Sequence, residues 1–314
     1  MDRYTVDRTI ANALYGQVLL ARDNKTHELV AIKKVNIAAA AAHTVVRGTY
    51  SKVPEDIDIE KHVNRVLSAD GGHASVLRMR ADFEHDGYDH MVFDYCNGGD
   101  LFDRTNDGPL TSDVAQRYMR QIIQGVGFMH AKGIAHRDLS LENILLHDDA
   151  CYICDFGLAT PTSLICKDTV GKHFYMSPEV TQGVEYDPAK ADVWSLGIML
   201  FMLLTGAPLC QAAAPRDTRF AYFQMNGLKG LLRSWNMRMD KDAQDLLEHM
   251  LCVCPVKRFT LDQVLAHPYM AAPEASIAID TLPTSSGKTI STPAKAIAFL
   301  NQVFSRPLVD APLL

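Results

Sequence analysis

The hydrophobic periodicity of this chain changes from mainly strand-like to helical near residue 100, and that change limits the folds available to it. Residues 4–35 and 76–96 alternate apolar with polar positions and are rich in β-branched and aromatic residues, as strands are. From Thr111 onward the period is helical, and the first stripe contains Met119, Ile122, Ile123, Val126 and Met129. Further helical patterns follow at 190–205, 240–252 and 260–267. The sequence therefore predicts an α+β fold in which a small strand-rich lobe (4–96) precedes a larger helix-rich lobe (97–270).

Several segments add detail to this division. Residues 54–68 interrupt the strands with a helical pattern, and Asn97-Gly98-Gly99 has the composition of a hinge. The alanine-rich run at 37–43 is of low complexity and is expected to lengthen the connection between the third strand and that helix. Residues 271–314 are rich in Ala, Pro, Ser and Thr and are expected to form a C-terminal tail, in which 293–304 could form a short amphipathic helix.

The composition excludes several classes of protein. The net charge of −6 over 314 residues provides no basic field, so we expect no nucleic-acid partner. We also expect no membrane span, because the longest apolar stretch, at 196–209, is too short and is typical of a buried helix. Seven cysteines without framework spacing favour reduced thiols. A monomer in the cytoplasm is expected, and the nucleus remains an open alternative.

Separate motifs follow one another in an informative order. They are "VAIKK" (30–34), "HRDLSLEN" (136–143), "CDFG" (154–157), "YMSPE" (175–179), "DVWSLG" (192–197) and "PVKRFT" (255–260). Together they resemble the eukaryotic protein kinase family over residues 4 to about 270. "CNGGDLFDR" (96–104) and "LSLEN" (139–143) resemble the calcium/calmodulin-dependent and AMP-activated branch. The resemblance implies a two-lobed kinase fold with ATP and Mg²⁺ as cofactors.

The resemblance also implies a site for ATP. Lys33 would offer a cation to the α- and β-phosphates, and a buried lysine needs an anionic partner. Glu60 is the preferred partner, one turn before Val63 on the predicted helix, and Glu55 is the competitor. Phe93 would be the gatekeeper before the hinge. The residues expected to hold ATP are Ile10, Ala11, Ala13, Gly16, Val18, Ala31, Lys33, Glu60, Asp94, Cys96, Asp100, Glu142, Leu145 and Asp155.

Three residues match the chemical positions of the family. Asp138 is the expected base or hydroxyl-orienting group. Asn143 and Asp155 carry the hard oxygen atoms that Mg²⁺ prefers and are its expected ligands. The catalytic residues implied by the resemblance are Asp138, Lys33 and Asn143, and Lys172 joins them for the reason given below.

The phosphate-binding loop departs from the family pattern. The expected Gly-x-Gly-x-x-Gly is Ala11-Asn12-Ala13-Leu14-Tyr15-Gly16, so two glycines are alanines. Alanine costs steric energy at positive φ, and its Cβ would lie near the phosphates. We therefore expect a loop that stands further from ATP and binds it more weakly.

A second departure concerns the cation that faces the transferred phosphate. Most Ser/Thr kinases have lysine where this chain has Ser140, and most have Gly-Thr where it has Gly171-Lys172. One interpretation is a swap, in which Lys172 supplies the cation and Ser140 takes the hydroxyl role. The other is that Lys172 is a solvated charge of the activation segment. Losing such a donor outright could cost ~10²–10³ in rate.

The same stretch bears on substrate and regulation. Glu142 favours the Ser/Thr class and Lys172 slightly favours the tyrosine class; we expect Ser/Thr. Asp100 and Glu142 could read a basic residue upstream of the target hydroxyl. Arg137 could pair with Asp168 in place of a phosphate, or Thr169 could be phosphorylated. Glu179 with Arg258, and Asp192 beneath the catalytic loop, are expected scaffold residues.

The sequence thus predicts a protein serine/threonine kinase that acts on protein substrates. The alternative from another class is a kinase-like ATP-binding scaffold with little or no phosphotransfer. Ala11, Ala13 and Ser140 support the alternative, and the intact Lys33 and Asp138 oppose it.

Overall fold

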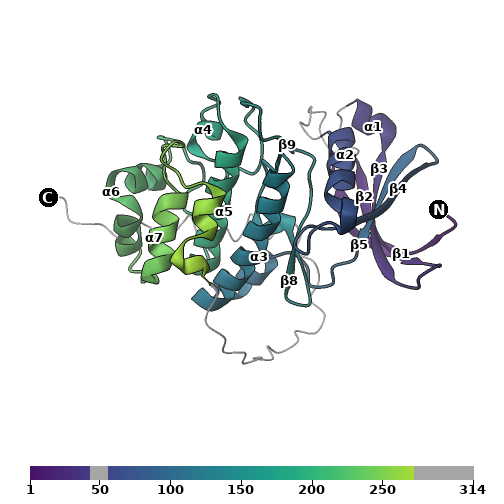
Figure 1. The fold of residues 1–314 in the computed structure, drawn as a ribbon, viewed down its shortest axis with the longest axis horizontal. Coiled ribbons are helices and arrows are strands. Elements are labelled where there is room, and N and C mark those ends of the chain that lie inside the picture. Colours follow the sequence, from purple (N-terminus) through teal and green to yellow (C-terminus); the bar gives the residue numbers. More distant parts are fainter. Residues whose placement is uncertain (43–55, 272–314) are drawn as a thin grey trace.

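The computed structural model describes residues 1–42 and 56–271, and it has two lobes (Figure 1). The smaller lobe is a five-stranded antiparallel sheet in the order β1-β2-β3-β5-β4. Its strands are β1 (Tyr4–Ala13), β2 (Gly16–Asp23), β3 (Leu29–Asn36), β4 (Met79–His85) and β5 (Tyr88–Asp94). The predicted α+β class, with a small sheet lobe and a larger helical lobe, is confirmed.

Two helices belong to the smaller lobe, α1 (Ile37–Ala41) and α2 (Ile57–Ser68). Helices make up most of the larger lobe, and in chain order these are α3 (Ser112–Ala131), α4 (Pro178–Thr181), α5 (Pro188–Thr205), α6 (Thr218–Ser234), α7 (Lys241–Met250) and α8 (Leu261–Leu265). Two short antiparallel sheets of two strands, β6 (Ile134–Ala135) with β9 (Thr160–Pro161) and the hairpin of β7 (Ile144–His147) with β8 (Ala150–Ile153), flank the segments that bear the chemical motifs. Four 3₁₀ turns complete the description: Ala69–Gly71, Asp103–Asp107, Leu141–Asn143 and Pro268–Met270.

The structure adds two helices to the sequence prediction. Part of the alanine run, expected to lengthen the connection before α2, forms the short helix α1, and Asn36 accepts from the backbone N–H of Ala39. Helix α6 was not predicted, because Gly227, at φ 67°, interrupts its helical period. The N-cap residue of α3 is Thr111, and its side chain makes no capping hydrogen bond. The expected short helix at 293–304 lies outside the described residues.

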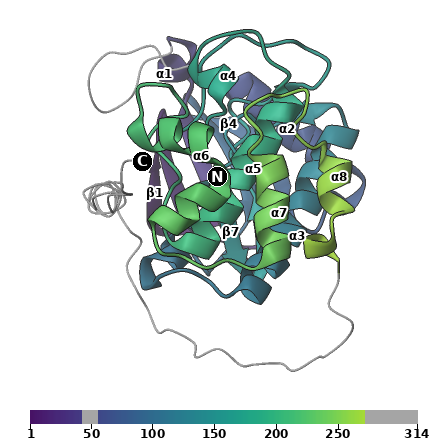
Figure 2. The same cartoon turned by 90° about the vertical axis from the view of Figure 1, so that its left-hand side faces the viewer.

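Helix α5 forms the centre of the large lobe. Figure 2 shows it behind α7, and it packs against α3 on its other side. Apolar residues surround the whole helix, and Trp194 and Phe201 are fully buried. Among the described residues α5 alone has the length and composition of a membrane span, but 83% of that stretch is buried inside the protein. It is therefore a core helix, as predicted for residues 196–209.

A buried ion pair joins two segments of the large lobe that are far apart in the sequence. Arg258 Nη1 and Nη2 lie 2.6 and 3.0 Å from the two carboxylate oxygens of Glu179. Arg258 also donates to the carbonyl oxygens of Cys252 and Lys190, and its guanidinium lies 5.1 Å from the ring centroid of Trp194. The pair connects α4, α5 and the segment before α8, which agrees with its predicted scaffold role.

Replacing Arg258 with alanine leaves the Glu179 carboxylate buried without a cation. We expect Arg258→Ala to lower the free energy of unfolding by about 3–5 kcal/mol, measured by urea denaturation. Arg233→Ala, an exposed arginine on α6, is the matched control and is expected to change it by less than about 0.5 kcal/mol. Similar losses of stability in both variants would contradict the structural role of the Glu179–Arg258 pair.

Candidate active site

The turn between β1 and β2 forms the edge of the site where the sequence predicted a phosphate-binding loop. Ala11 pairs with Val18 and Ala13 pairs with Gly16, so the strands continue up to a two-residue turn. Neither alanine has a positive φ. The expected conformational cost of these alanines is therefore wrong, because the extended backbone suits them. Only the bulk of their Cβ atoms distinguishes them from glycine here.

Gly16 is required for a different reason from the one predicted. A Cβ atom at this position would lie 1.9 Å from the carbonyl oxygen of Lys34 on β3. The residue before it, Tyr15, was not identified from the sequence as part of the site. Its side chain is 1% exposed and belongs to an apolar cluster with Val35 and Met91. The tip of the turn is therefore folded inward against β3.

Lys33 and Glu60 meet as predicted. Lys33 Nζ lies 2.6 Å from Glu60 Oε1 and 3.7 Å from Asp155 Oδ1. Burial raises the pKa of Glu60, and the charge of Lys33 opposes that rise. The charge of Lys33 lowers the pKa of Asp155 against the effect of burial. The competitor Glu55 lies outside the described residues.

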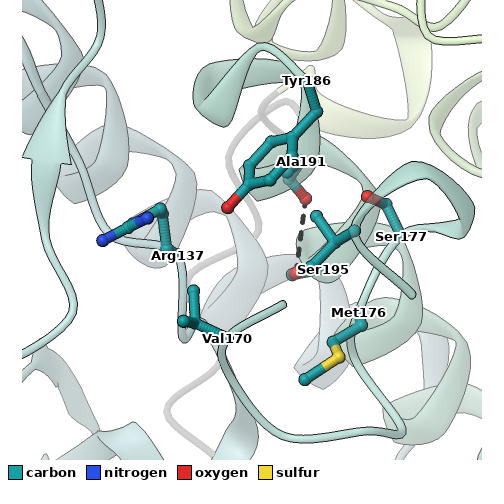
Figure 3. Close-up of a pocket in the computed structure, with 8 residues that line it drawn as sticks. Arg137, Val170, Met176, Ser177, Tyr186, Ala191 and Ser195 are labelled. Carbon is teal, nitrogen blue, oxygen red and sulfur yellow. Dashed lines mark hydrogen bonds between the residues drawn. The ribbon is translucent and has the colours of Figure 1, made fainter. Parts of the chain in front are cut away.

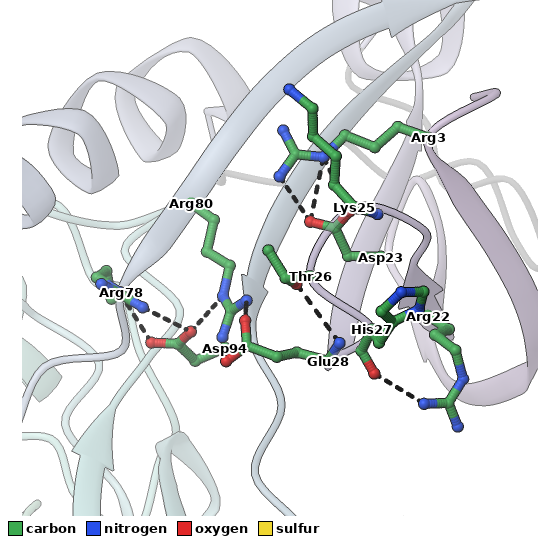
Figure 4. A network of polar contacts seen from close by, with 10 residues as sticks. All are labelled: Arg3, Arg22, Asp23, Lys25, Thr26, His27, Glu28, Arg78, Arg80 and Asp94. Atoms are coloured by element: carbon green, nitrogen blue, oxygen red, sulfur yellow. Dashed lines mark hydrogen bonds and ion pairs between the residues drawn. The ribbon is translucent and has the colours of Figure 1, made fainter.

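The hinge begins at the end of β5. The side chain of Asp94 is held from behind by Arg78, with Nε 3.0 Å from Oδ2, and by Arg80, which also reaches Glu28 (Figure 4). The backbone N–H of Asp94 already donates to the carbonyl oxygen of Arg78. The backbone N–H of Asp94 is therefore not available to a ligand. Cys96 packs, partly buried, against the same apolar cluster as Tyr15.

Below the hinge, Asp100 forms a bridge to Leu145. Burial raises the pKa of Asp100 to about 6, with smaller contributions from the charges of Asp103 and Glu142. Glu142 accepts a hydrogen bond from the hydroxyl of the buried Tyr175, at 2.9 Å. The two predicted acidic positions therefore lie close enough to influence each other.

The catalytic loop is held by Asp192, as predicted. The buried carboxylate of Asp192 accepts hydrogen bonds from the backbone N–H groups of His136 (2.8 Å) and Arg137 (2.9 Å). Its pKa is lowered despite burial, chiefly by a hydrogen bond from His130. Arg137 has a φ of 64°, a left-handed conformation that a large side chain rarely adopts. Asp192 therefore stabilises a strained backbone immediately before Asp138.

Four side chains converge at the end of this loop. Lys172 Nζ lies 3.0 Å from Asp138 Oδ2, 2.9 Å from Ser140 Oγ and 3.1 Å from Asn143 Oδ1. Asn143 Nδ2 in turn donates to the carboxylate of Asp138, at 2.9 Å. Burial alone would lower the pKa of Lys172, but the charges of Asp138, Glu142 and Asp155 and the hydrogen bond to Asp138 together raise it. The Lys172 ammonium is thus a charged group that contacts three side chains of the site, although its side chain is still 35% exposed.

Gly171 makes this arrangement possible. It has a φ of 96°, and a Cβ atom there would lie 2.7 Å from the carbonyl oxygen of Arg137. Because the backbone can approach so closely, the N–H of Lys172 donates to Asp138 Oδ1 at 3.0 Å. Lys172 therefore contacts Asp138 through its backbone as well as its side chain.

The activation segment runs past Arg137. Arg137 Nη1 lies 3.6 Å from Asp168 Oδ2, and Arg137 Nε donates to the carbonyl of Leu158. The hydroxyl of Thr169 donates to the carbonyl of Val180. A small cavity behind the segment is lined by Arg137, Val170, Tyr186 and Ser195 among others (Figure 3). Its lining contains none of the residues predicted to hold ATP.

The oxygen atoms at Asn143 and Asp155 suit Mg²⁺. The amide nitrogen of Asn143 is held by Asp138, its Oδ1 accepts from Lys172 Nζ at 3.1 Å, and the Asp155 carboxylate is 39% exposed with a lowered pKa. Within residues 1–42 and 56–271, no group of three or more His, Cys, Asp or Glu side chains is arranged so that it could hold a metal ion. Two oxygen donors would leave positions for phosphate oxygens and water, which is the coordination that Mg²⁺ favours.

Comparison with known proteins agrees with this geometry. The protein kinase domain matches residues 4–270. The chain is 31% identical to serine/threonine-protein kinase chk1 of Schizosaccharomyces pombe over 86% of its own length and 53% of that protein. It is 33% identical to a probable serine/threonine-protein kinase of Dictyostelium discoideum over 86% of its length and 31% of that protein. It is 32% identical to serine/threonine-protein kinase SAPK2 of rice, over 86% and 76% of the two chains. The chain thus spans about half or less of the first two relatives, and all three are consistent with the predicted Ser/Thr class and branch.

The raised pKa of Asp100 predicts a pH-dependent stability. The carboxylate ionises near pH 3.9 in the unfolded chain but near pH 6 in the folded one. Folding therefore loses stability as the pH rises through this window, and the loss is complete above pH 6. Asp100→Asn should raise the free energy of unfolding by about 1–2 kcal/mol at pH 7.5, after discounting for solvent.

The gain should disappear near pH 4, where the folded protein already holds Asp100 protonated. Urea denaturation at both pH values measures this gain in the free energy of unfolding. Glu84→Gln, at an exposed position of β4, is the control. An equal gain at both pH values would show that Asp100 is not the titrating group.

Proposed function

Because the chain belongs to the protein kinase family, we propose that it transfers the γ-phosphate of ATP to serine or threonine hydroxyls of protein substrates. The observation that carries this proposal is the convergence of Asp138, Asn143 and a cation, Lys172, beside the Lys33–Glu60 pair. Phosphoryl transfer depends mainly on positioning and on stabilising charge, and this set of groups can do both. Mg²⁺, when bound, would neutralise the charge of the phosphates.

In this proposal, different residues would bind different parts of Mg-ATP. Lys33, held by Glu60, would bind the α- and β-phosphates, and Asn143 and Asp155 would hold the metal. The adenine would lie between Ile10, Val18 and Ala31 above and Leu145 below, with the hinge at Asp94 and Cys96 offering backbone groups and Asp100 contacting the ribose. The buried side chain of Tyr15 belongs to the apolar cluster against which Ala31 and Leu145 also pack.

Asp138 would orient the substrate hydroxyl and accept its proton. Both of its carboxylate oxygens are engaged by Lys172 or Asn143, which fixes their direction. In this proposal Lys172 supplies the cation that faces the transferred phosphate, and Ser140 takes the hydroxyl role. The support is that Lys172 Nζ reaches Ser140 Oγ, so the cation occupies the neighbourhood from which the family's usual lysine would act.

The finer properties are part of the same proposal. Asp100 and Glu142 would favour a substrate with a basic residue upstream of the target hydroxyl, because both present negative charge beside the cleft. Asp168 would pair constitutively with Arg137, since the 3.6 Å contact exists without a phosphate. Thr169 already uses its hydroxyl internally. A monomer acting in the cytoplasm, without nucleic acid, completes the proposal.

The first test is transfer from labelled ATP to a generic basic Ser/Thr peptide with Mg²⁺. Asp138→Asn keeps the shape of the side chain but removes the base, and we expect it to lower kcat by about 10²–10⁴-fold. A thermal shift with Mg-ATP on both proteins serves as the control for binding. Equal background transfer with intact ATP binding would instead favour the kinase-like scaffold.

The position of the cation can be tested separately. Lys172→Ala should lower kcat by about 10²–10³-fold, because a charge that stabilises the transition state is lost. The double variant Ser140→Lys/Lys172→Thr restores the usual family arrangement and should recover most of that loss. Full activity in Lys172→Ala, together with a gain in Ser140→Lys alone, would show that Lys172 is not the substituted cation.

A further inference from the structure

Glu60 can pair with Lys33 only while helix α2 lies against the sheet, and further ion pairs connect this helix to the sheet. The residue after Glu60 is Lys61, whose Nζ lies 2.6 Å from Asp89 Oδ2 on β5 and 3.6 Å from Asp82 Oδ2 on β4. One turn later, Arg65 Nε donates to Asp82 Oδ1 at 3.1 Å. We call the set Lys61, Arg65, Asp82 and Asp89 the α2 clamp.

The geometry of the clamp fixes the rotation of the helix as well as its distance from the sheet. Lys61 and Arg65 are four residues apart and therefore lie on one face of α2. Glu60 precedes Lys61 by one residue, so its side chain points about 100° away around the helix. Because the clamp holds one face on two different strands, the face that carries Glu60 is directed toward Lys33. A helix free to rotate would lose that pair first.

The clamp is partly shielded from water. The side chains of Lys61, Asp82 and Asp89 are 13%, 15% and 8% exposed. Asp89 Oδ1 is buried without a hydrogen-bond partner in the part of the chain that the structure describes. Burial works against the charge of Lys61, yet the hydrogen bond and charge of Asp89 raise its pKa. Removing Lys61 would leave the Asp89 carboxylate without its cation, while Asp82 would keep only Arg65. The simplest way to hydrate Asp89 is to move α2 off the sheet.

The first turn of α2 is attached to the catalytic side. The backbone N–H of Asp56, its N-cap residue, donates to the carbonyl oxygen of Gly157 at 3.1 Å. Gly157 follows Asp155 by two residues, so the position of α2 is connected to the segment that would hold the metal. A displacement of α2 would therefore affect both the Lys33–Glu60 pair and the Asp155 segment.

We propose that Lys61 is a positioning residue that holds α2 inward through Asp89 and Asp82, so that the Lys33–Glu60 pair forms from contacts within this chain. This inference rests on the proposed phosphotransfer for its kinetic readout. It implies that α2 needs no partner protein to reach its active position. Lys61 itself touches neither ATP nor the reacting atoms and acts only through Glu60.

The decisive experiment is a double-variant cycle. Lys61→Met should lower kcat at saturating Mg-ATP by about 10²-fold, the scale expected for a small misplacement of a catalytic group. In the Glu60→Gln background, the same Lys61→Met change should cost little more, because its effect passes through Glu60. Lys61→Arg should keep most of the activity, since arginine can still pair with both carboxylates. Lys34→Met, which removes a cation placed 4.0 Å over Tyr88 on the sheet, is the matched control.

Hydrogen exchange gives a readout that does not depend on turnover. Lys61→Met should speed exchange of the amides in 57–68 while leaving those of α3 and α5 unchanged. Equal losses from Lys61→Met in both backgrounds, or unchanged exchange in α2, would overturn the clamp. If the unmodified chain shows no Asp138-dependent transfer, the proposed function fails, and the exchange result still decides whether the clamp exists.

Discussion

The buried carboxylate of Asp192 is the constraint on which the geometry of the site depends. A charge that is 1% exposed must be compensated, and here the compensation comes from His130 and from two backbone N–H groups of the catalytic loop. To supply those groups the loop turns back toward α5, which places Arg137 in a left-handed conformation. That bend directs Asp138 away from the core and toward Asn143 and Lys172. The core helix thus determines where the chemical groups point.

The cation beside Asp138 illustrates how electrostatics constrains a site. Phosphoryl transfer needs positive charge at a place in space, whichever segment of the chain supplies it. In this chain the serine of the catalytic loop leaves room for Lys172, which arrives from the activation segment over Gly171. The arrangement couples Asp138 to the segment that contains Lys172 through two hydrogen bonds from that one residue. Displacing this segment would therefore remove the positive charge beside Asp138 together with the contacts that orient its carboxylate.

Two further features of the smaller lobe also depend on how closely neighbouring segments approach each other. The β1–β2 turn tolerates Ala11 and Ala13 because its strands remain extended, whereas Gly16 is needed because the backbone of β3 passes too close for any side chain. Helix α2 faces a similar demand, since Glu60 must point at Lys33 from a separate element. The ion pairs of Lys61 with Asp82 on β4 and Asp89 on β5 hold the helix in this orientation. Because these side chains are largely shielded from water, removing one member of a pair is costly.

The sequence by itself determined the class of fold and most of the chemical groups. Period-2 and period-3.6 patterns located the sheet, α2, α3, α5 and α7, because apolar faces must be buried whatever the neighbours are. Motif order and residue chemistry identified Lys33, Glu60, Asp138 and Asp192 in the arrangement that the structure has. Helix α6 was missed, because its interrupting Gly227 breaks the local signal on which such predictions rest.

Only the tertiary structure decided which side chains Lys172 contacts, because residues 138, 140 and 172 are brought together by folding and no local pattern records the distances between them. The same holds for the conformation of Ala11 and Ala13, for the inward side chain of Tyr15 and for the α2 clamp. Each depends on how closely two separate segments approach. Periodicity and composition describe what a segment must bury, and the contacts between segments follow from packing the whole chain.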